Sequence, residues 1–390
     1  MSKLHEEKIA QAITYLNEYD LDSWLIFSSE GSDSAVNLVT GLKTVGNTFF
    51  IITKEGHKYA IASIIDAQES ENSGLFDEVI RYSNNVHEVL NQLMMRLNPR
   101  HIALDYSQSD HLCDGLTRGK YLWLSENLDE SLVNRFTSSE KVLKKIRSIK
   151  TESEIDRIKK AIDLTTDIYD DVFKRLKAGM TETQVAEMFV DEMRSRGVTN
   201  GITNKLTYPM VLKERIAHRE PGDAVIQKGD FLIIDFSVNY EGYVSDIART
   251  AYFLKAGEVE APEAMRRRFN SVYEAITLVK ENIRPGMQGY QLDDLARKHL
   301  LDNDMPEISH ATGHQIGRLV HDGGALLGPR WPRYGSAPYE TIEENMVFTI
   351  EPTILYSNGD YSILTEENIV VKEKGGEFLS KRQENIVLIK

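Results

Sequence analysis

The chain has 390 residues, which favours two domains of ordinary size. Apolar residues make up 41% of it and charged residues 27%, a composition that excludes an intrinsically disordered protein. The formal net charge of −14 argues against nucleic acid and anionic membranes as main partners. The single cysteine, Cys113, excludes an internal disulfide and suits a reducing cytosol. The N-terminus lacks the apolar run of a signal peptide, and no stretch of about 18 apolar residues predicts a membrane span.

Short strands alternate with helices along the first part of the chain. Helical periodicity covers residues 8–19 and 86–97. Strands are predicted at residues 23–28, 48–53, 58–63 and 101–106, with a hairpin turn at 54–57. This alternation predicts a smaller α/β domain over residues 1–150. It contains no glycine-rich phosphate loop.

A capping box at Thr151 and Glu154 follows a polar, basic stretch, and we place the domain boundary near residues 148–151. A second capping box, at Thr181 and Gln184, opens another helix. Residues 262–282 predict a long helix that ends before Pro285-Gly286. Strand-like segments then cluster between turns. Residues 151–390 therefore predict an α+β domain with a largely antiparallel sheet.

Two aspartates are predicted to converge within a pair of apolar strands. If Glu241-Gly242 forms the loop between these strands, Asp246 lies diagonal to Asp235 on the same face, roughly 7–8 Å away at Cα. Two carboxylates at this distance could act together. The structural alternative is that Asp235 caps a turn and Asp246 pairs with Arg249.

Two glutamates are predicted to face each other across a second hairpin. Asn358-Gly359 is the strongest two-residue hairpin signal, and with it as the loop Glu351 lies opposite Glu366. Opposed like charges are destabilising unless a cation or a shared proton neutralises them. The alternatives are a slipped register or an exposed face, and Pro352 counts against the pairing because it removes a ladder hydrogen bond.

Three of the ten histidines, His310, His314 and His321, lie within one short segment. The spacing of the first two is that of a zinc-protease helix, but Gly313 and the lack of a glutamate between them favour a loop and strand. The alternative is that each is an ordinary core or surface histidine. Together, two Asp, two Glu and one His suit manganese, cobalt, zinc or iron. Four carboxylates suit two such ions about 3.5–4 Å apart.

The order of these motifs resembles the pita-bread metallopeptidase family, which includes aminopeptidase P, prolidase and methionine aminopeptidase. The resemblance lies in residues 232–250, 312–322, 348–352 and 365–370, and in residues 217–223, which are similar to the segment with the family's additional active-site histidine. The first 150 residues are similar to the creatinase-type N-terminal domain in length and α/β character.

The resemblance implies a role for each candidate metal ligand. Asp235 would chelate one metal ion, and Asp246 would bridge both. His314 and Glu351 would bind the second ion, and Glu366 would also bridge. Glu351 could in addition shuttle a proton from the attacking water.

The resemblance also implies that His218 and His321 flank the substrate and that His310 lines the pocket. It implies hydrolysis of short peptides, at Xaa-Pro bonds, by a cytoplasmic homodimer. Manganese is the expected metal, with cobalt, zinc or iron as alternatives. A different C–N substrate or a non-catalytic peptide- or protein-binding scaffold would use the same fold, although the five ligand positions argue against a scaffold and against a metal-free enzyme.

One position departs from the family pattern. Xaa-Pro peptidases usually carry an arginine two residues before the last metal glutamate, and here that residue is Leu364. This change predicts an altered substrate preference. Residues 323–335 are similar to an active-site-rim loop, to which the sequence assigns no ligand.

Overall fold

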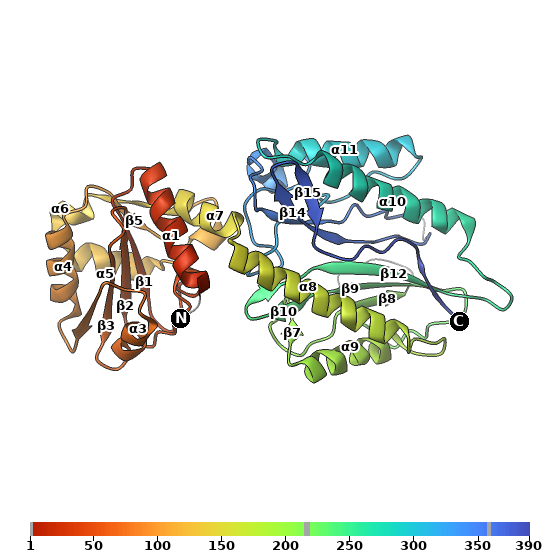
Figure 1. Ribbon diagram of the computed structural model, residues 1–390, viewed down its shortest axis with the longest axis horizontal. Helices are drawn as coiled ribbons and strands as arrows, with labels where there is room; N and C mark the ends of the chain where they lie inside the picture. The colour runs from red at the N-terminus through yellow and green to blue at the C-terminus, as the bar shows by residue number, and fades with distance from the viewer. Residues whose placement is uncertain (1–2, 214–218, 357–359) are drawn as a thin grey trace. The chain divides into compact units, whose positions relative to one another are not determined.

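The computed structural model describes residues 3–213, 219–356 and 360–390, shown in Figure 1. The chain divides into two compact units, Met1–Arg147 and Ser148–Lys390. Each unit has its own hydrophobic core. Among the described residues, no helix combines the length and apolar character needed to cross a membrane.

The first unit is built on one six-stranded sheet with the strand order β4-β3-β2-β1-β5-β6. The central strands β1, β2 and β3 are antiparallel, whereas β4, β5 and β6 join them in parallel. The strands are β1 (Ser23–Ser28), β2 (Thr48–Thr53), β3 (Lys58–Ser63), β4 (Glu78–Tyr82), β5 (Ile102–Leu104) and β6 (Phe136–Ser138). The predicted strands and the hairpin between β2 and β3 are thus confirmed.

Helices cover both faces of this sheet (Figure 1). They are α1 (Lys3–Glu18), α2 (Ser34–Val39), α3 (Ala67–Ser73), α4 (Val86–Leu97), α5 (Arg118–Asn127), α6 (Glu130–Val133) and α7 (Glu140–Ser148). Alternate residues of β1 point into different cores. Trp24 and Ile26 pack with residues of α1, α2 and α7, whereas Leu25 and Phe27 pack with residues of α4, α5 and α6. A strand buried on both faces is typical of α/β domains.

The second unit contains helices and small sheets of mostly antiparallel strands, as predicted. The sheets have the strand orders β16-β12-β9-β8, β11-β10-β7 and β13-β14-β15. Their strands are β7 (Thr199–Asn200), β8 (Met210–Lys213), β9 (Phe231–Phe236), β10 (Val238–Tyr240), β11 (Tyr243–Val244), β12 (Ile247–Phe253), β13 (Val347–Ile350), β14 (Glu367–Lys372), β15 (Gly375–Phe378) and β16 (Val387–Ile389). Only the pair β12–β16 is parallel among those described.

Four long helices flank these sheets: α8 (Glu152–Phe173), α9 (Glu182–Arg196), α10 (Glu263–Asn282) and α11 (Gly289–Asp302). Helices α8 and α9 lie beside β8 and β9, and α10 lies beside β14 and β15 (Figure 1). Both predicted capping boxes are present, with the side chains of Thr151 and Thr181 each accepting a hydrogen bond from the N–H three residues on.

The first predicted register is correct. Strands β10 and β11 meet at the Glu241-Gly242 turn with Tyr240 opposite Tyr243. The same register continues into β9 and β12, where Asp235 lies opposite Ala248. Asp246 therefore lies diagonal to Asp235, as the turn predicted.

The second predicted register is also correct. Ile350 of β13 lies opposite Glu367 of β14, and an isolated bridge joins Ile354 to Ile363. Both pairs fit a turn at residues 358–359, although that turn lies outside the described residues. Glu351 and Glu366 each follow the same register, so Pro352 does not shift it.

Candidate metal centre

A histidine and several carboxylates from separate segments meet in the second unit. Ligand atoms of Asp246, His314 and Glu366 all lie within 4.8 Å of one another. The Nε2 atom of His314 lies 3.2 Å from Oε1 of Glu351 and 3.6 Å from Oδ2 of Asp246. Asp235, in β9, is close enough to Asp246 and Glu351 for their charges to perturb one another. The structure thus brings together all five candidate ligands.

Backbone pairing holds the histidine segment against β13. The N–H of Thr349 donates to the carbonyl of His314 at 2.8 Å, and the N–H of His314 donates to Oγ1 of Thr349 at 3.1 Å. The N–H of Glu351 donates to the carbonyl of Thr312 at 2.7 Å. His314 therefore lies on an extended segment, as predicted, and not on a zinc-protease helix.

Two carboxylates of the centre, those of Asp246 and Glu366, are deeply buried. Asp246 is 6% exposed and Glu366 is 2% exposed. Among the described residues, Oε1 of Glu366 has no hydrogen-bond partner. A buried carboxylate oxygen without a donor is costly, and a bound cation would remove that cost. The donor set of carboxylates and one imidazole fits a divalent metal ion.

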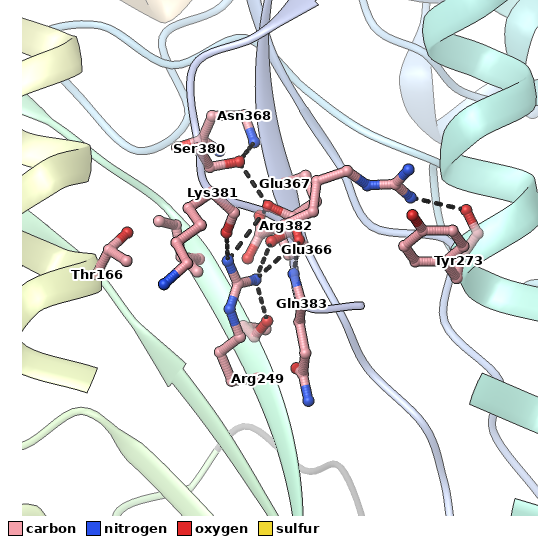
Figure 2. A network of polar contacts seen from close by, with 12 residues as sticks. Thr166, Arg249, Tyr273, Glu366, Glu367, Asn368, Ser380, Lys381, Arg382 and Gln383 are labelled. Carbon is pink, nitrogen blue, oxygen red and sulfur yellow. Dashed lines mark hydrogen bonds and ion pairs between the residues drawn. The ribbon is translucent and has the colours of Figure 1, made fainter. Parts of the chain in front are cut away.

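The predicted alternative for Asp246 is wrong, because Arg249 pairs with another residue. Its guanidinium lies 3.2 Å from the Glu367 carboxylate and donates to the main-chain oxygen of Glu366 at 2.8 Å (Figure 2). It also donates to the carbonyl of Lys381 at 2.8 Å. Arg249 therefore stabilises the segment that contains Glu366 and Glu367 and pairs with Glu367 in place of Asp246.

Crowding of negative charge changes the acidity of the centre in the metal-free protein. Burial and the neighbouring Glu351 raise the pKa of Asp235 to about 7. Burial and the other carboxylates raise the pKa values of Asp246 and Glu366 well above their ordinary range. Protons and a metal cation compete for these carboxylates, so we expect metal binding to release protons.

Glu351 behaves differently because histidines surround it. Burial acts to raise its pKa, but the hydrogen bond from His314 and the nearby His310 and His321 outweigh burial and lower the pKa. The same contact with Glu351 outweighs burial at His314 and raises the pKa of that imidazole. Glu351 is thus the carboxylate of the centre that is held ionised.

The structure places two of the three further histidines beside these groups. The His321 ring lies with its centroid 4.3 Å from that of His314, and His321 is exposed. His310 is half-buried, and its Nδ1 lies 2.7 Å from the carbonyl of Ala311. His218 lies outside the described residues.

Leu364 lies in an apolar cluster beside the centre. It is buried and packs with Ile233 and Ala248, the residue opposite Asp235. Its carbonyl accepts a hydrogen bond from the Thr250 hydroxyl at 2.7 Å. The side chains that pack around Leu364 are therefore apolar at the position where the resemblance predicted an arginine.

The predicted rim loop contacts the His310 segment. The N–H of Ala311 donates to the Tyr334 hydroxyl at 3.1 Å. Trp331 stacks on Tyr334, and the guanidinium of Arg297 on α11 lies 4.8 Å from the Trp331 ring centroid. Arg297 in turn donates to the carbonyl of His310. The loop is thus joined to the segment that carries two of the candidate histidines.

Sequence reasoning missed the residues that support the carboxylates. Glu367 and Asn368 directly follow Glu366, and both are buried. Glu367 accepts hydrogen bonds from Ser380 and Gln383 in addition to its pairing with Arg249 (Figure 2). The available signal was a run of polar residues at 365–368 inside a strand that is otherwise apolar.

Comparisons with known proteins agree with this geometry. The model of metallopeptidase family M24 matches residues 156–373. An uncharacterized peptidase of Staphylococcus aureus (strain bovine RF122 / ET3-1) is 28% identical over 335 residues, which are 85% of this chain and 86% of that protein. The uncharacterized peptidase YqhT of Bacillus subtilis (strain 168) is 27% identical over 248 residues, which are 63% of this chain and 66% of that protein.

Two solved structures share the fold over nearly the whole chain. The X-Pro aminopeptidase from Thermotoga maritima MSB8 has a TM-score of 0.75 at 24% identity and covers 98% of this chain and 99% of its own. The Xaa-Pro dipeptidase from Bacillus anthracis has a TM-score of 0.76 at 22% identity and covers 99% and 100%. The α+β pita-bread fold predicted for the second unit is thereby confirmed.

Proposed function

The chain belongs to metallopeptidase family M24, and from this premise we propose that it cleaves short peptides at Xaa-Pro bonds with two divalent metal ions. One observation carries this proposal. Four carboxylates and an imidazole converge in a buried site, and Oε1 of Glu366 has no hydrogen-bond partner among the described residues. Such a site is costly for the folded protein unless cations occupy it.

Each side chain has a proposed place around the two ions. Asp235 would hold one ion, and His314 with Glu351 would hold the other. Asp246 and Glu366 would serve both ions, and the ligand atoms of Asp246, His314 and Glu366 lie within 4.8 Å of one another, as a common site requires. When bound, the metal ions polarise the scissile carbonyl and lower the pKa of the attacking water.

The remaining steps belong to side chains. Glu351, which the histidines keep ionised, accepts the proton of the attacking water and passes it toward the leaving amine. His321 lies beside His314 and donates to the oxygen on which negative charge develops. His218 assists the leaving amine, and His310 lines the pocket.

The metal, the assembly and the location are also proposals. A site rich in oxygen with one imidazole suits manganese first, and cobalt, zinc or iron after it. The homodimer and the cytoplasmic location remain predictions from the sequence.

A second candidate keeps the fold and the metals but changes the substrate. It is favoured by Leu364, whose apolar packing with Ile233 and Ala248 leaves no guanidinium beside Asp235. The enzyme would then act weakly on plain Xaa-Pro dipeptides and better on another peptide or C–N substrate.

Hydrolysis of a peptide panel tests both candidates. The full-length protein is freed of metal and reloaded separately with Mn²⁺, Co²⁺ or Zn²⁺, and it is then assayed on Xaa-Pro dipeptides, Xaa-Pro tripeptides and proline-free controls. We expect metal-dependent cleavage of the proline peptides alone. Equal cleavage of the controls would contradict the Xaa-Pro assignment. Two bound equivalents of metal without any cleavage would favour a binding scaffold.

A further inference from the structure

Part of strand β12 lacks a partner strand on one of its sides. Strand β9 pairs with β12 from Ile247 to Tyr252. On the other side, β16 begins its pairing at Ala251. The peptide groups before Ala251 on that side are buried and need other hydrogen-bond partners, because orphaned buried peptide groups are costly.

Two side-chain amides supply those partners, and they do so in the same way. The Oδ1 of Asn368 accepts from the N–H of Asp246 at 3.3 Å, and its Nδ2 donates to the Asp246 carbonyl at 2.6 Å. The Oε1 of Gln383 accepts from the N–H of Thr250 at 3.1 Å, and its Nε2 donates to the Thr250 carbonyl at 2.6 Å. Each amide thus replaces one peptide group of a missing strand.

The two amides differ in what they hold. Gln383 holds Thr250, which lies in the middle of β12. Asn368 holds Asp246, a proposed bridging ligand. Asn368 also lies two residues after the other proposed bridging ligand, Glu366, so a single side chain connects the segments that carry both ligands.

Asn368 itself is held firmly. It is fully buried, its N–H donates to the Ser380 hydroxyl at 3.0 Å, and its carbonyl accepts from the N–H of Leu379 at 2.8 Å (Figure 2). The neighbouring Glu366 N–H donates to the carbonyl of Ala248 at 3.2 Å. A displacement of Asp246 relative to Glu366 would therefore break the Asn368 contacts first.

We propose that Asn368 is a positioning residue that sets the separation of the Asp246 and Glu366 carboxylates and thereby the affinity for the second metal ion. The proposal rests on the proposed dinuclear function. Metal sites bind tightly only when their ligands are held near the geometry of the complex, and removal of a residue that orients a ligand typically lowers metal affinity or activity about 10–100-fold.

The test compares Asn368→Ala with Gln383→Ala, because each variant removes a two-bond contact to one peptide unit, Asp246 just before β12 or Thr250 within it. Gln383→Ala also removes a hydrogen bond to the carbonyl of Asn385 and is therefore the more severe of the two changes. Metal-free full-length proteins are titrated with Mn²⁺ in a calorimeter, and their thermal unfolding is followed without metal. We expect both variants to lose similar thermal stability. Only Asn368→Ala should bind the second Mn²⁺ about 10–100-fold more weakly than the parent.

A third variant covers the case in which Asn368→Ala does not fold. Asn368→Thr suits a strand and keeps one hydroxyl that can bond to the Asp246 main chain, so its second Mn²⁺ affinity should lie between those of the parent and Asn368→Ala. The proposal is overturned if Asn368→Ala and Asn368→Thr bind two Mn²⁺ as the parent does. It is also overturned if Gln383→Ala loses the same affinity, because the effect would then be one of general stability.

The same titration separates this proposal from the proposed activity. A parent protein that binds two Mn²⁺ but cleaves no peptide overturns the activity and leaves the role of Asn368 decided by its variants. A parent that binds fewer than two Mn²⁺ overturns the dinuclear centre and, with it, this role.

Discussion

Asp33 and Asp105 of the first unit are as deeply buried as the carboxylates of the metal centre in the second. Both are 1% exposed, and among the described residues the Oδ2 atom of each has no hydrogen-bond donor. Burial and the neighbouring Asp33 raise the pKa of Asp105 well above its ordinary value. Each unit thus contains carboxyl groups that lie close together away from solvent, two in the first and four in the second, but their surroundings differ.

In the first unit, neutral donors and a proton can satisfy the pair. The Trp24 indole N–H donates to Oδ1 of Asp105 at 2.6 Å, and the Ser139 hydroxyl donates to the same atom. The N–H of Ala35 donates to Oδ1 of Asp33 at 2.9 Å. When Asp105 is protonated, which its raised pKa favours, its carboxyl group can donate a hydrogen bond to Asp33.

In the second unit, a single shared proton is insufficient to neutralise the carboxylates that lie together. Asp235, Asp246, Glu351 and Glu366 perturb one another, and an imidazole lies among them. The comparison teaches that buried acidic groups alone do not identify a metal centre. What distinguishes the second cluster is the number of carboxylates from separate strands and the presence of His314, which is a common metal ligand.

The largest effect should come from removing one carboxylate of the second cluster. We expect Asp246→Asn to abolish peptide hydrolysis and sharply lower metal occupancy, because a neutral amide cannot bridge two cations. Metal content is measured by elemental analysis and turnover on the best peptide of the panel. The matched control is Asp105→Asn, a buried substitution of the same kind in the first unit, which should keep metal and turnover. Near-normal turnover with two bound ions in Asp246→Asn would contradict the assignment of Asp246 as a metal ligand.

A large effect is also expected from replacing His321, which lies beside His314 in the second cluster. His321→Ala should lower turnover by about 10²–10³, the usual range for loss of one donor to a developing oxyanion. Its metal content should stay nearly unchanged, because the proposed imidazole ligand is His314, which lies 3.2 Å from Glu351 and 3.6 Å from Asp246.

The control for this prediction is His299→Ala, whose histidine lies on α11 beside Glu274. It should leave both metal content and turnover intact. Loss of metal in His321→Ala would mean that the two histidines have exchanged roles.

A smaller effect should follow from adding a cation to the second cluster. Leu364→Arg places a guanidinium in the apolar wall near Asp235, where it can offer a fork of donors to that carboxylate. We expect the parent to act weakly on Xaa-Pro dipeptides and the variant to gain about 10–100-fold in kcat/KM at saturating metal.

Leu364→Met serves as the control for this gain, since it changes the shape of the wall without adding charge. It should leave the preference of the parent unchanged. An efficient, strictly Xaa-Pro parent that Leu364→Arg only damages would show that the leucine is compensated elsewhere.

The local part of this centre was predictable from the sequence. Two-residue turns determine the register of the strands they join, and so the Glu241-Gly242 turn brought Asp235 and Asp246 onto one face. The spacing of histidines around Gly313 likewise indicated an extended segment.

The contacts between separate sheets were not predictable in this way. Asn368 reaches Asp246, and Arg249 reaches Glu367, across a junction that depends on how distant segments pack. Sequence patterns contain no local signal for such pairs, and so the predicted alternative that joined Arg249 to Asp246 was wrong. The Asp33–Asp105 pair was missed for the same reason.

The smallest predicted effect concerns the Asp33–Asp105 pair and the pH dependence of the free energy of unfolding. The folded-state pKa of Asp105 lies above the ordinary 3.8, so between these values the folded protein holds a proton that the unfolded chain has released. The free energy of unfolding therefore falls as pH rises from about 4 through the folded pKa. Asp105→Asn cannot titrate, and its amide can donate to Asp33 in place of the proton. We expect this variant to be more stable than the parent by roughly 1 kcal/mol or more at pH 8 and to lack the decline with pH.

Urea unfolding at pH 5 and pH 8 measures this difference by tryptophan fluorescence, to which Trp24 and Trp123 of the first unit contribute together with Trp331 of the second. Burial raises the pKa of Asp33 as well, against the opposing effects of Lys120 and Arg147, so both members of the pair act with the same sign. Asp129→Asn is the control, and it should keep the parent's decline in stability between pH 5 and pH 8. Hydrogen bonds from Ser131 lower the pKa of Asp129, so its contribution to stability is present at high pH and lost in acid. Parallel pH profiles for Asp105→Asn and the parent would show that the first pair shares no proton, and the contrast between the two clusters would then fail.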